Sequence, residues 1–143
     1  MNYDLDHICL AVVSIDKAAD RICKCLGYRV KTEKVINTRQ DIYVQFFTKE
    51  GSIDFKLIMP ASRQSPVVSF LKKHGEGLHH VGFKTDNVCD AFDEIVSKGA
   101  ISTLPPEPGE AFCNELIAFS YLGNGLSVEL VDTDKRVFVK KDL

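Results

Sequence analysis

The sequence lacks the features that would place it in a specialised class of protein. No apolar run approaches the roughly 18 residues that a membrane-spanning helix needs. The charges nearly cancel, with 18 Lys and Arg against 20 Asp and Glu for a formal net charge of −2. Charge therefore gives no reason to expect binding to nucleic acid or to a membrane. It leaves small anionic ligands open, because a local pocket can be basic on a nearly neutral protein.

Signals for export and for disulfide or metal-binding cysteines are also missing. The amino terminus, MNYDLDHICLAVV, has neither the cationic segment nor the small-residue cleavage site of a signal peptide. The five cysteines are odd in number and show no metal-ligand or CxxC spacing. A cytoplasmic protein with reduced, partly buried thiols is the expectation.

Hydrophobic patterns predict the same order of elements twice in this 143-residue chain. The first half reads as strand 5–13, helix 15–26, and strands 28–36, 42–48 and 53–59. Ser14 is the expected N-cap of its helix, and Gly27 is expected to end that helix. The second half reads as strand 78–85, helix 88–96 after the cap Asp86-Asn87, and strands 115–121 and 126–131. A short helix over 65–73, with Pro66 in its first turn, joins the two halves.

A single offset of 73 residues aligns the two halves. It places Leu5 on Leu78, His7 on His80, Ala18 on Ala91, Asp20 on Asp93, Ile22 on Ile95, Phe46 on Phe119 and Leu57 on Leu130. The sequence therefore predicts an α+β fold in which two βαβββ modules, about 5–60 and 78–132, pair their curved mixed sheets around a shared cleft. Residues 1–143 form one domain in this prediction, with a linker helix in 61–77 and a carboxyl-terminal tail over 133–143.

Two histidines and a glutamate are candidate metal ligands. His7 and His80 are equivalent under the offset, and Glu129 lies in the last strand of the second module. A single histidine in a strand is more often a hydrogen-bonded core residue. Two at equivalent positions, with a glutamate facing the same cleft, favour a site for a divalent ion such as Zn, Fe, Co, Mn or Ni.

Lys56 is the anomaly in this site, because the offset aligns it with Glu129. An ammonium group is not a metal ligand, and burying it without a partner is costly. At about 4 Å and an effective dielectric constant near 20, it would repel a divalent ion by roughly 8 kcal/mol. Lys56 either points to solvent from an edge strand or faces the cleft. Because Lys56 and Glu129 share one phase in their strands, either both face the cleft or neither does. We expect weak or absent metal and an ion pair between Lys56 and Glu129.

The remaining polar residues near the cleft are expected to have a structural role or to lie on the surface. His79 should point away from His80 because neighbouring side chains alternate along a strand, so a structural role is expected. Arg39 and Gln40 precede the strand 42–48 and could reach the cleft mouth, although a surface position is the simpler prediction.

Three segments resemble one enzyme family. Residues 65–88, SPVVSFLKKHGEGLHHVGFKTDNV, are similar to the centre of methylmalonyl-CoA epimerases of the glyoxalase (vicinal oxygen chelate) superfamily. LDHICLAV resembles their first strand and GLSVELV their last, so the resemblance covers about 5–132. It implies metal ligands at His7, His80 and Glu129. Lys56 stands where the family has a Gln or Glu ligand, and Arg39 lies near the place of a catalytic Glu in some members.

The resemblance implies an isomerase or lyase that acts on an acyl thioester, such as an acyl-CoA, or on a similar carbonyl compound. A metal or the Lys56 ammonium would stabilise an enolate, and Glu129 would be the acid or base in a metal-free site. A homodimer is compatible with this assignment. Two alternatives stay open. One is a non-catalytic binder of small molecules with a degenerate metal site, and the other is an iron oxygenase with two His and one carboxylate.

Overall fold

One open, curved sheet runs through the computed structural model, which describes residues 1–136. Its strand order is β2-β4-β5-β1-β6-β9-β8-β7, and β3 adds to β4. The strands are β1 (Asp4–Ala11), β2 (Arg29–Val30), β3 (Val35–Asn37), β4 (Ile42–Thr48), β5 (Asp54–Pro60), β6 (Gly77–Lys84), β7 (Ile101–Gly109), β8 (Glu115–Tyr121) and β9 (Ser127–Val131). The helices are α1 (Ile15–Leu26), α2 (Pro66–His74), α3 (Val88–Ser97) and the short 3-10 helix η1 (Glu110–Phe112).

The helices begin and end where the sequence signals predicted. Ser14 accepts a hydrogen bond from the Lys17 backbone N–H at the start of α1, and Gly27 ends that helix in the left-handed conformation. Asn87 caps α3 in the same way through the Asp90 N–H. These local signals fix the ends of the helices that cover the sheet.

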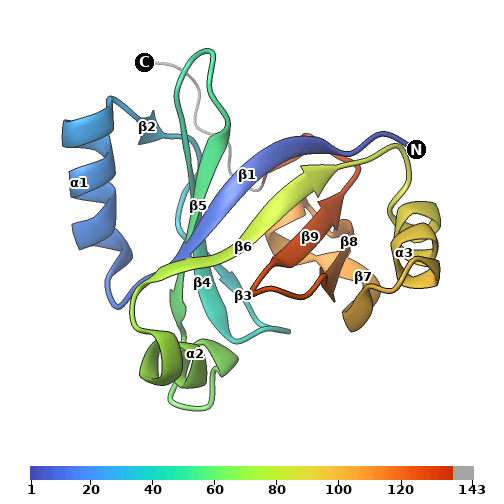
Figure 1. Ribbon diagram of the computed structural model, residues 1–143. Helices are drawn as coiled ribbons and strands as arrows, with labels where there is room; N and C mark the ends of the chain where they lie inside the picture. The colour runs from blue at the N-terminus through green and yellow to red at the C-terminus, as the bar shows by residue number, and fades with distance from the viewer. Residues whose placement is uncertain (137–143) are drawn as a thin grey trace.

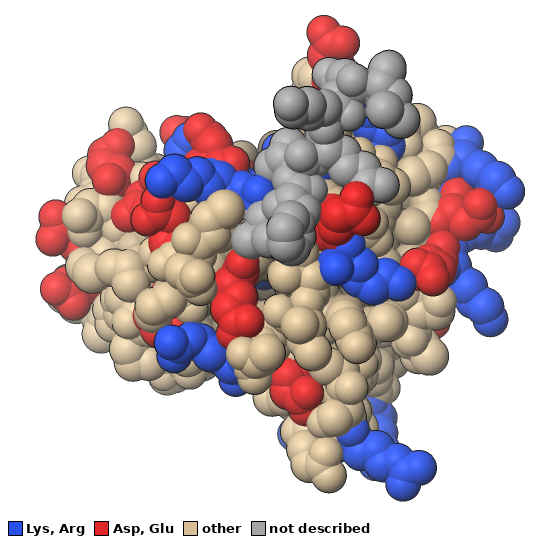
Figure 2. All heavy atoms as spheres, turned by 180° about the vertical axis from the view of Figure 1, so that it is seen from behind, with Lys and Arg blue, Asp and Glu red and all other residues tan. Residues whose placement is uncertain are grey.

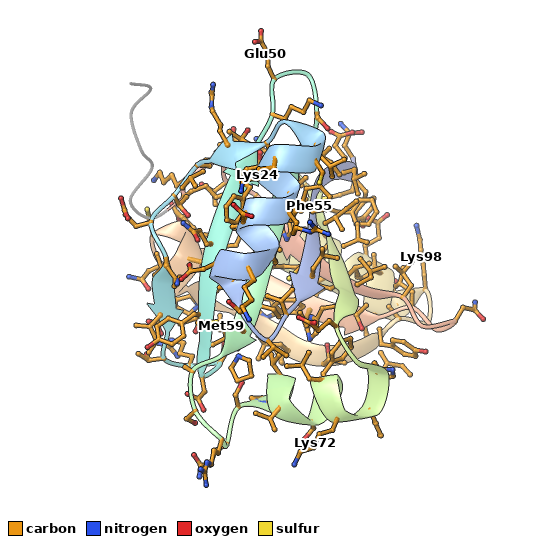
Figure 3. The ribbon with its side chains drawn as sticks, turned by 90° about the vertical axis from the view of Figure 1, so that its left-hand side faces the viewer. Lys24, Glu50, Phe55, Met59, Lys72 and Lys98 are labelled. Carbon is orange, nitrogen blue, oxygen red and sulfur yellow. The ribbon has the colours of Figure 1, made fainter. Side chains whose placement is uncertain are left out.

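The helices α1 and α3 lie over opposite ends of the sheet, each against its own half (Figure 1). Buried Ile15 and Ile22 of α1 pack on the first half, where Phe55 and Met59 also contact this cluster (Figure 3). In α3, the buried residues Val88, Ala91 and Phe92 pack on β8 and β9. A third cluster contains residues of both halves and includes Phe46 and Phe112. The core therefore joins the two halves.

The two halves share one pairing register. The parallel pair Ile8↔Phe55 recurs as Val81↔Val128, and the antiparallel pair Val44↔Ile58 recurs as Ile117↔Val131, both under the offset of 73. Strands β1 and β6 run antiparallel at the centre and join the halves (Figure 1). The predicted fold class is confirmed.

The predicted strands differ from the structure at two places. The strand expected over 28–36 divides into β2 and β3, with Thr32 between them accepting the Phe46 backbone N–H on its Oγ1. The strand β7 was not predicted because it contains Pro105, Pro106 and Pro108. Proline is tolerated there because β7 is the edge of the sheet and pairs with β8 alone.

The described part of the chain shows no helix long and apolar enough to cross a membrane. Acidic and basic side chains are interspersed over the face seen in Figure 2. Of the predicted tail over 133–143, residues 137–143 lie outside the described residues.

Replacing Gly82 with Ala should destabilise the fold, because Gly82 pairs with His7 and its added Cβ would lie 2.0 Å from His7 Cε1. A buried ring cannot yield without moving its neighbours, so we expect a loss of about 2 kcal/mol in the free energy of unfolding by urea. Gly109→Ala is the comparison variant and should cost less, since its added Cβ would overlap less, meeting Ile117 side-chain atoms at 2.9 Å and the Glu115 carbonyl oxygen at 3.5 Å. Wild-type stability in Gly82→Ala would contradict the packing described here.

Candidate active site

The carboxylate of Glu129 is the meeting point of three side chains. Its Oε1 lies 2.9 Å from His7 Nε2, 3.2 Å from His80 Nε2 and 2.9 Å from Lys56 Nζ. Strands β1, β6, β5 and β9 supply these four residues, whose exposed fractions are 0%, 2%, 3% and 1% in that order. The sequence-predicted residues therefore converge, and the ion pair expected between Lys56 and Glu129 is present.

Burial and the neighbouring charges act in opposite directions on these groups. Burial raises the pKa of the Glu129 carboxyl, but the Lys56 charge and the hydrogen bonds from His7 and His80 outweigh it and hold that pKa well below its usual range. For His80, burial and the Lys56 charge lower the pKa to about 3. At neutral pH the site thus contains an ionised carboxylate beside a neutral His80 imidazole.

Three aromatic rings surround the Lys56 ammonium. The centroids of Phe112, Phe119 and Phe46 lie 5.6, 5.8 and 6.0 Å from Nζ. Phe46 and Phe119 are equivalent under the offset of 73, and each pairs with the charged residue on the strand beside it. The ammonium therefore has one carboxylate and three ring contacts within 6.0 Å.

Equivalent β-bulges precede both site histidines. In the β1–β6 pairing, Leu5↔Phe83 is followed by His7↔Gly82, so Asp6 is an extra residue in β1. Further along, Cys9↔His80 is followed by Leu10↔Leu78, so His79 is an extra residue in β6. The offset of 73 relates Asp6 to His79. A bulge turns its extra residue out of the strict alternation of the strand.

The bulges bring a polar group to Nδ1 of each site histidine. Asp6 Oδ2 lies 2.6 Å from His7 Nδ1, and His79 Nδ1 lies 2.8 Å from His80 Nδ1. The prediction that His79 points away from His80 is therefore wrong, because it assumed regular alternation. Partners of this kind fix the ring orientation, so Nε2 of both histidines faces Glu129.

The sequence reasoning did not identify Asp6 or Arg136. Arg136 Nη2 donates to Asp6 Oδ2 at 2.6 Å, and its guanidinium carbon lies 4.8 and 4.6 Å from the Phe46 and Phe112 ring centroids. Burial raises the pKa of the Asp6 carboxyl, but the His7 hydrogen bond and the Arg136 charge lower it overall. Asp6 adjoins His7 in the sequence, but regular alternation would turn it to the other face, and only the bulge brings it to His7 Nδ1. Arg136 lies in the segment predicted as a tail and offered no signal.

A cleft of about 440 Å³ leads to His80. Its walls are largely apolar, with Ile58, Leu104 and Phe119 among them, and His79 also lines it. Arg39 and Gln40 line it as well. Arg39 is exposed, as the preferred surface prediction had it, and both residues also reach the cleft. Lys56 and Glu129 are not among the lining residues. Glu129 contacts the lining residue His80, and Lys56 is paired with Glu129.

The donors only partly suit the divalent metal that the resemblance implies. The ligand atoms of His7, His80 and Glu129 all lie within 4.8 Å of one another, and two imidazoles with a carboxylate are suitable ligands for such an ion. The Lys56 ammonium, however, donates a hydrogen bond to Glu129 Oε1, the same oxygen that both imidazoles contact. With Lys56 in this place, the four residues do not form a site that suits a divalent cation.

A family model described as the Glyoxalase/Bleomycin resistance protein/Dioxygenase superfamily matches residues 6–119. The chain belongs to this superfamily. Among its relatives, the uncharacterized protein YqjC of Bacillus subtilis is 33% identical over 133 residues, which cover 90% of this chain and 91% of YqjC.

Methylmalonyl-CoA epimerases are also similar to this superfamily member. The human mitochondrial enzyme is 32% identical over 95 residues, 66% of this chain, and the match spans only 53% of the human protein. A Streptomyces coelicolor epimerase variant, solved in complex with 2-nitronate-propionyl-CoA, superposes with a TM-score of 0.79 at 26% identity and covers 92% of this chain and 97% of that chain. The resemblance seen in the sequence is confirmed.

The stability of the protein should fall as the pH is lowered from 7 to 5. Burial lowers the pKa of His79 to about 4 and that of His80 to about 3, whereas both bind a proton near pH 6.5 when unfolded. The unfolded state then gains protons first, and the slope from each histidine rises toward about 1.4 kcal/mol per pH unit as the pH falls below 6.5. Urea unfolding at pH 7, 6 and 5 measures this slope. His80→Gln should flatten it and exposed His74→Gln should not, so equal slopes in all three proteins would contradict the assignment.

Proposed function

We propose that this protein is an isomerase-type enzyme that removes and returns a proton beside the carbonyl of an acyl thioester such as an acyl-CoA. The observation that carries the proposal is the buried Lys56–Glu129 pair, which lies directly behind the cleft residue His80. It places a base and a cation together at the end of a largely apolar cleft. The similarity to methylmalonyl-CoA epimerases supports this reaction class.

In this proposal, Glu129 is the acid and base, and the Lys56 ammonium stabilises the enolate oxygen. Both groups are charged in the resting site, and Lys56 holds the carboxylate in its ionised form. When the carbonyl oxygen of a substrate accepts a hydrogen bond from Lys56, the carboxylate loses part of this stabilisation. Its affinity for a proton then rises at the moment when it must take one.

The acyl group has to pass the residues between the cleft and the ion pair. Phe119 both lines the cleft and lies 5.8 Å from Lys56 Nζ, and His80 both lines the cleft and contacts Glu129. The proposal therefore includes a movement of one of these two rings when substrate binds. Exposed Arg39 at the mouth is placed to meet the phosphate groups of a coenzyme A ester.

A binding protein without catalysis is the second candidate, and one observation favours it. Lys56 and Glu129 do not line the cleft, so a ligand could occupy the apolar space and never touch them. A small-molecule binder would then use the cleft walls and Arg39 alone. The iron oxygenase considered from the sequence is disfavoured by the Lys56 ammonium on its carboxylate ligand.

Exchange of the substrate α-proton separates the two candidates. Protein stripped with EDTA is incubated with methylmalonyl-CoA and other acyl-CoA esters in D2O, and deuterium at C2 is followed by mass spectrometry against protein-free controls. We expect catalysed exchange, and a loss on the order of 100-fold or more in Glu129→Gln because that variant lacks the base.

Glu50→Gln is the matched control for this experiment. Glu50 is exposed at the tip of the β4–β5 hairpin, far from the cleft (Figure 3), so this variant should keep full activity. Calorimetric binding of an acyl-CoA without any exchange would favour the binding protein instead. Exchange that survives in Glu129→Gln would assign the base to another residue.

A further inference from the structure

We infer that Lys56 is the resident cation of this site, so that the protein's own ammonium takes the place of the divalent metal and excludes it. This rests on the proposed function, in which Lys56 meets the substrate oxygen, and adds that the same ammonium keeps a divalent metal out of the site. It is tested by metal binding in the absence of substrate, so the two proposals can fail separately.

Strand pairing places Lys56 and Glu129 at matching points of the two halves. Lys56 is paired with Cys9 and Phe46, and its equivalent Glu129 is paired with Gly82 and Phe119. The two residues project from matching points of the two halves and meet at 2.9 Å, with side-chain exposures of 4% and 2%. The ion pair is thus a consequence of the repeat.

The surroundings of Lys56 Nζ suit an ammonium better than a metal. The Phe46, Phe112 and Phe119 rings, 5.6 to 6.0 Å away, attract a cation by their π-electrons but offer no lone pair to a metal. A divalent ion requires about four donor atoms. Lys56 itself supplies none while it is charged.

The charge balance of the buried cluster also favours the Lys56 ammonium over a divalent metal ion. Lys56 and Glu129 together are neutral, whereas a divalent ion added beside the charged Lys56 and Glu129 would leave two uncompensated positive charges in a buried site. Replacing Lys56 by glutamine would remove one of these charges and supply an amide oxygen as a fourth ligand.

The rest of a metal site is already in place. Asp6 and His79 contact Nδ1 of His7 and His80, and this leaves Nε2 of both rings facing the Glu129 carboxylate. Such outer partners orient the histidine ligands of metal centres. One substitution, Lys56→Gln, should therefore be sufficient to create a metal site.

Cobalt binding tests this inference directly. Untagged, EDTA-treated protein is titrated with Co²⁺ and followed by calorimetry, by visible absorption and by the midpoint of thermal unfolding. We expect no stoichiometric binding and no thermal shift in the wild type. Lys56→Gln should bind one Co²⁺ on the order of 100-fold or more tightly than the wild type and gain thermal stability with Co²⁺ concentration. His80→Ala in the Lys56→Gln background should abolish this gain.

Lys49→Gln is the matched control, because Lys49 Nζ also lies 6.0 Å from an aromatic centroid, that of Tyr28, but outside the site. It should bind Co²⁺ no better than the wild type. Lys56→Glu, refolded with Co²⁺, serves as a second variant if Lys56→Gln does not fold. Stoichiometric, tight Co²⁺ binding by the wild type would overturn the inference, and so would a folded Lys56→Gln or Lys56→Glu variant with no gain in affinity.

Discussion

The buried carboxylate oxygen of Glu129 is the constraint on which the site depends. A single oxygen, Oε1, accepts contacts from His7, His80 and Lys56 at 2.9 to 3.2 Å, all in the interior. An ionised carboxylate in this place would be strongly destabilising without a compensating charge, and Lys56 supplies it. Both imidazoles and the aromatic rings around the ammonium are arranged about this pair.

The repeated module explains why such a pair can exist. Each half places one residue of its last strand toward the other half, and the common register makes Lys56 and Glu129 equivalent. The same symmetry gives each site histidine a preceding bulge and a partner at Nδ1. A single substitution at one of two equivalent positions can therefore turn a ligand set into an ion pair while the scaffold stays the same.

The sequence predicted the parts of the site that depend on periodicity. The offset of 73 placed His7 with His80 and Lys56 with Glu129, because aligned strands of one repeat occupy matching positions.

Periodicity of the sequence could not predict departures from that periodicity. The bulges at Asp6 and His79 turn these side chains to the opposite face from the one that regular alternation predicts, and the local composition does not indicate a bulge. Strand β7 was missed because its three prolines argue against a strand, although the edge position tolerates them. The contact of Arg136 with Asp6 joins residues 130 positions apart, which a pattern of local spacing does not encode.

A double-mutant cycle on stability tests the central claim most directly. The free energy of unfolding in urea is measured at pH 7 for the wild type, Lys56→Met, Glu129→Gln and the double variant. Each single change leaves one buried charge without its partner and should cost about 3 to 5 kcal/mol, whereas the double variant restores neutrality. The account predicts a coupling energy of about 2 kcal/mol or more between Lys56 and Glu129. Costs that add to within about 0.5 kcal/mol would show that the two residues do not depend on each other.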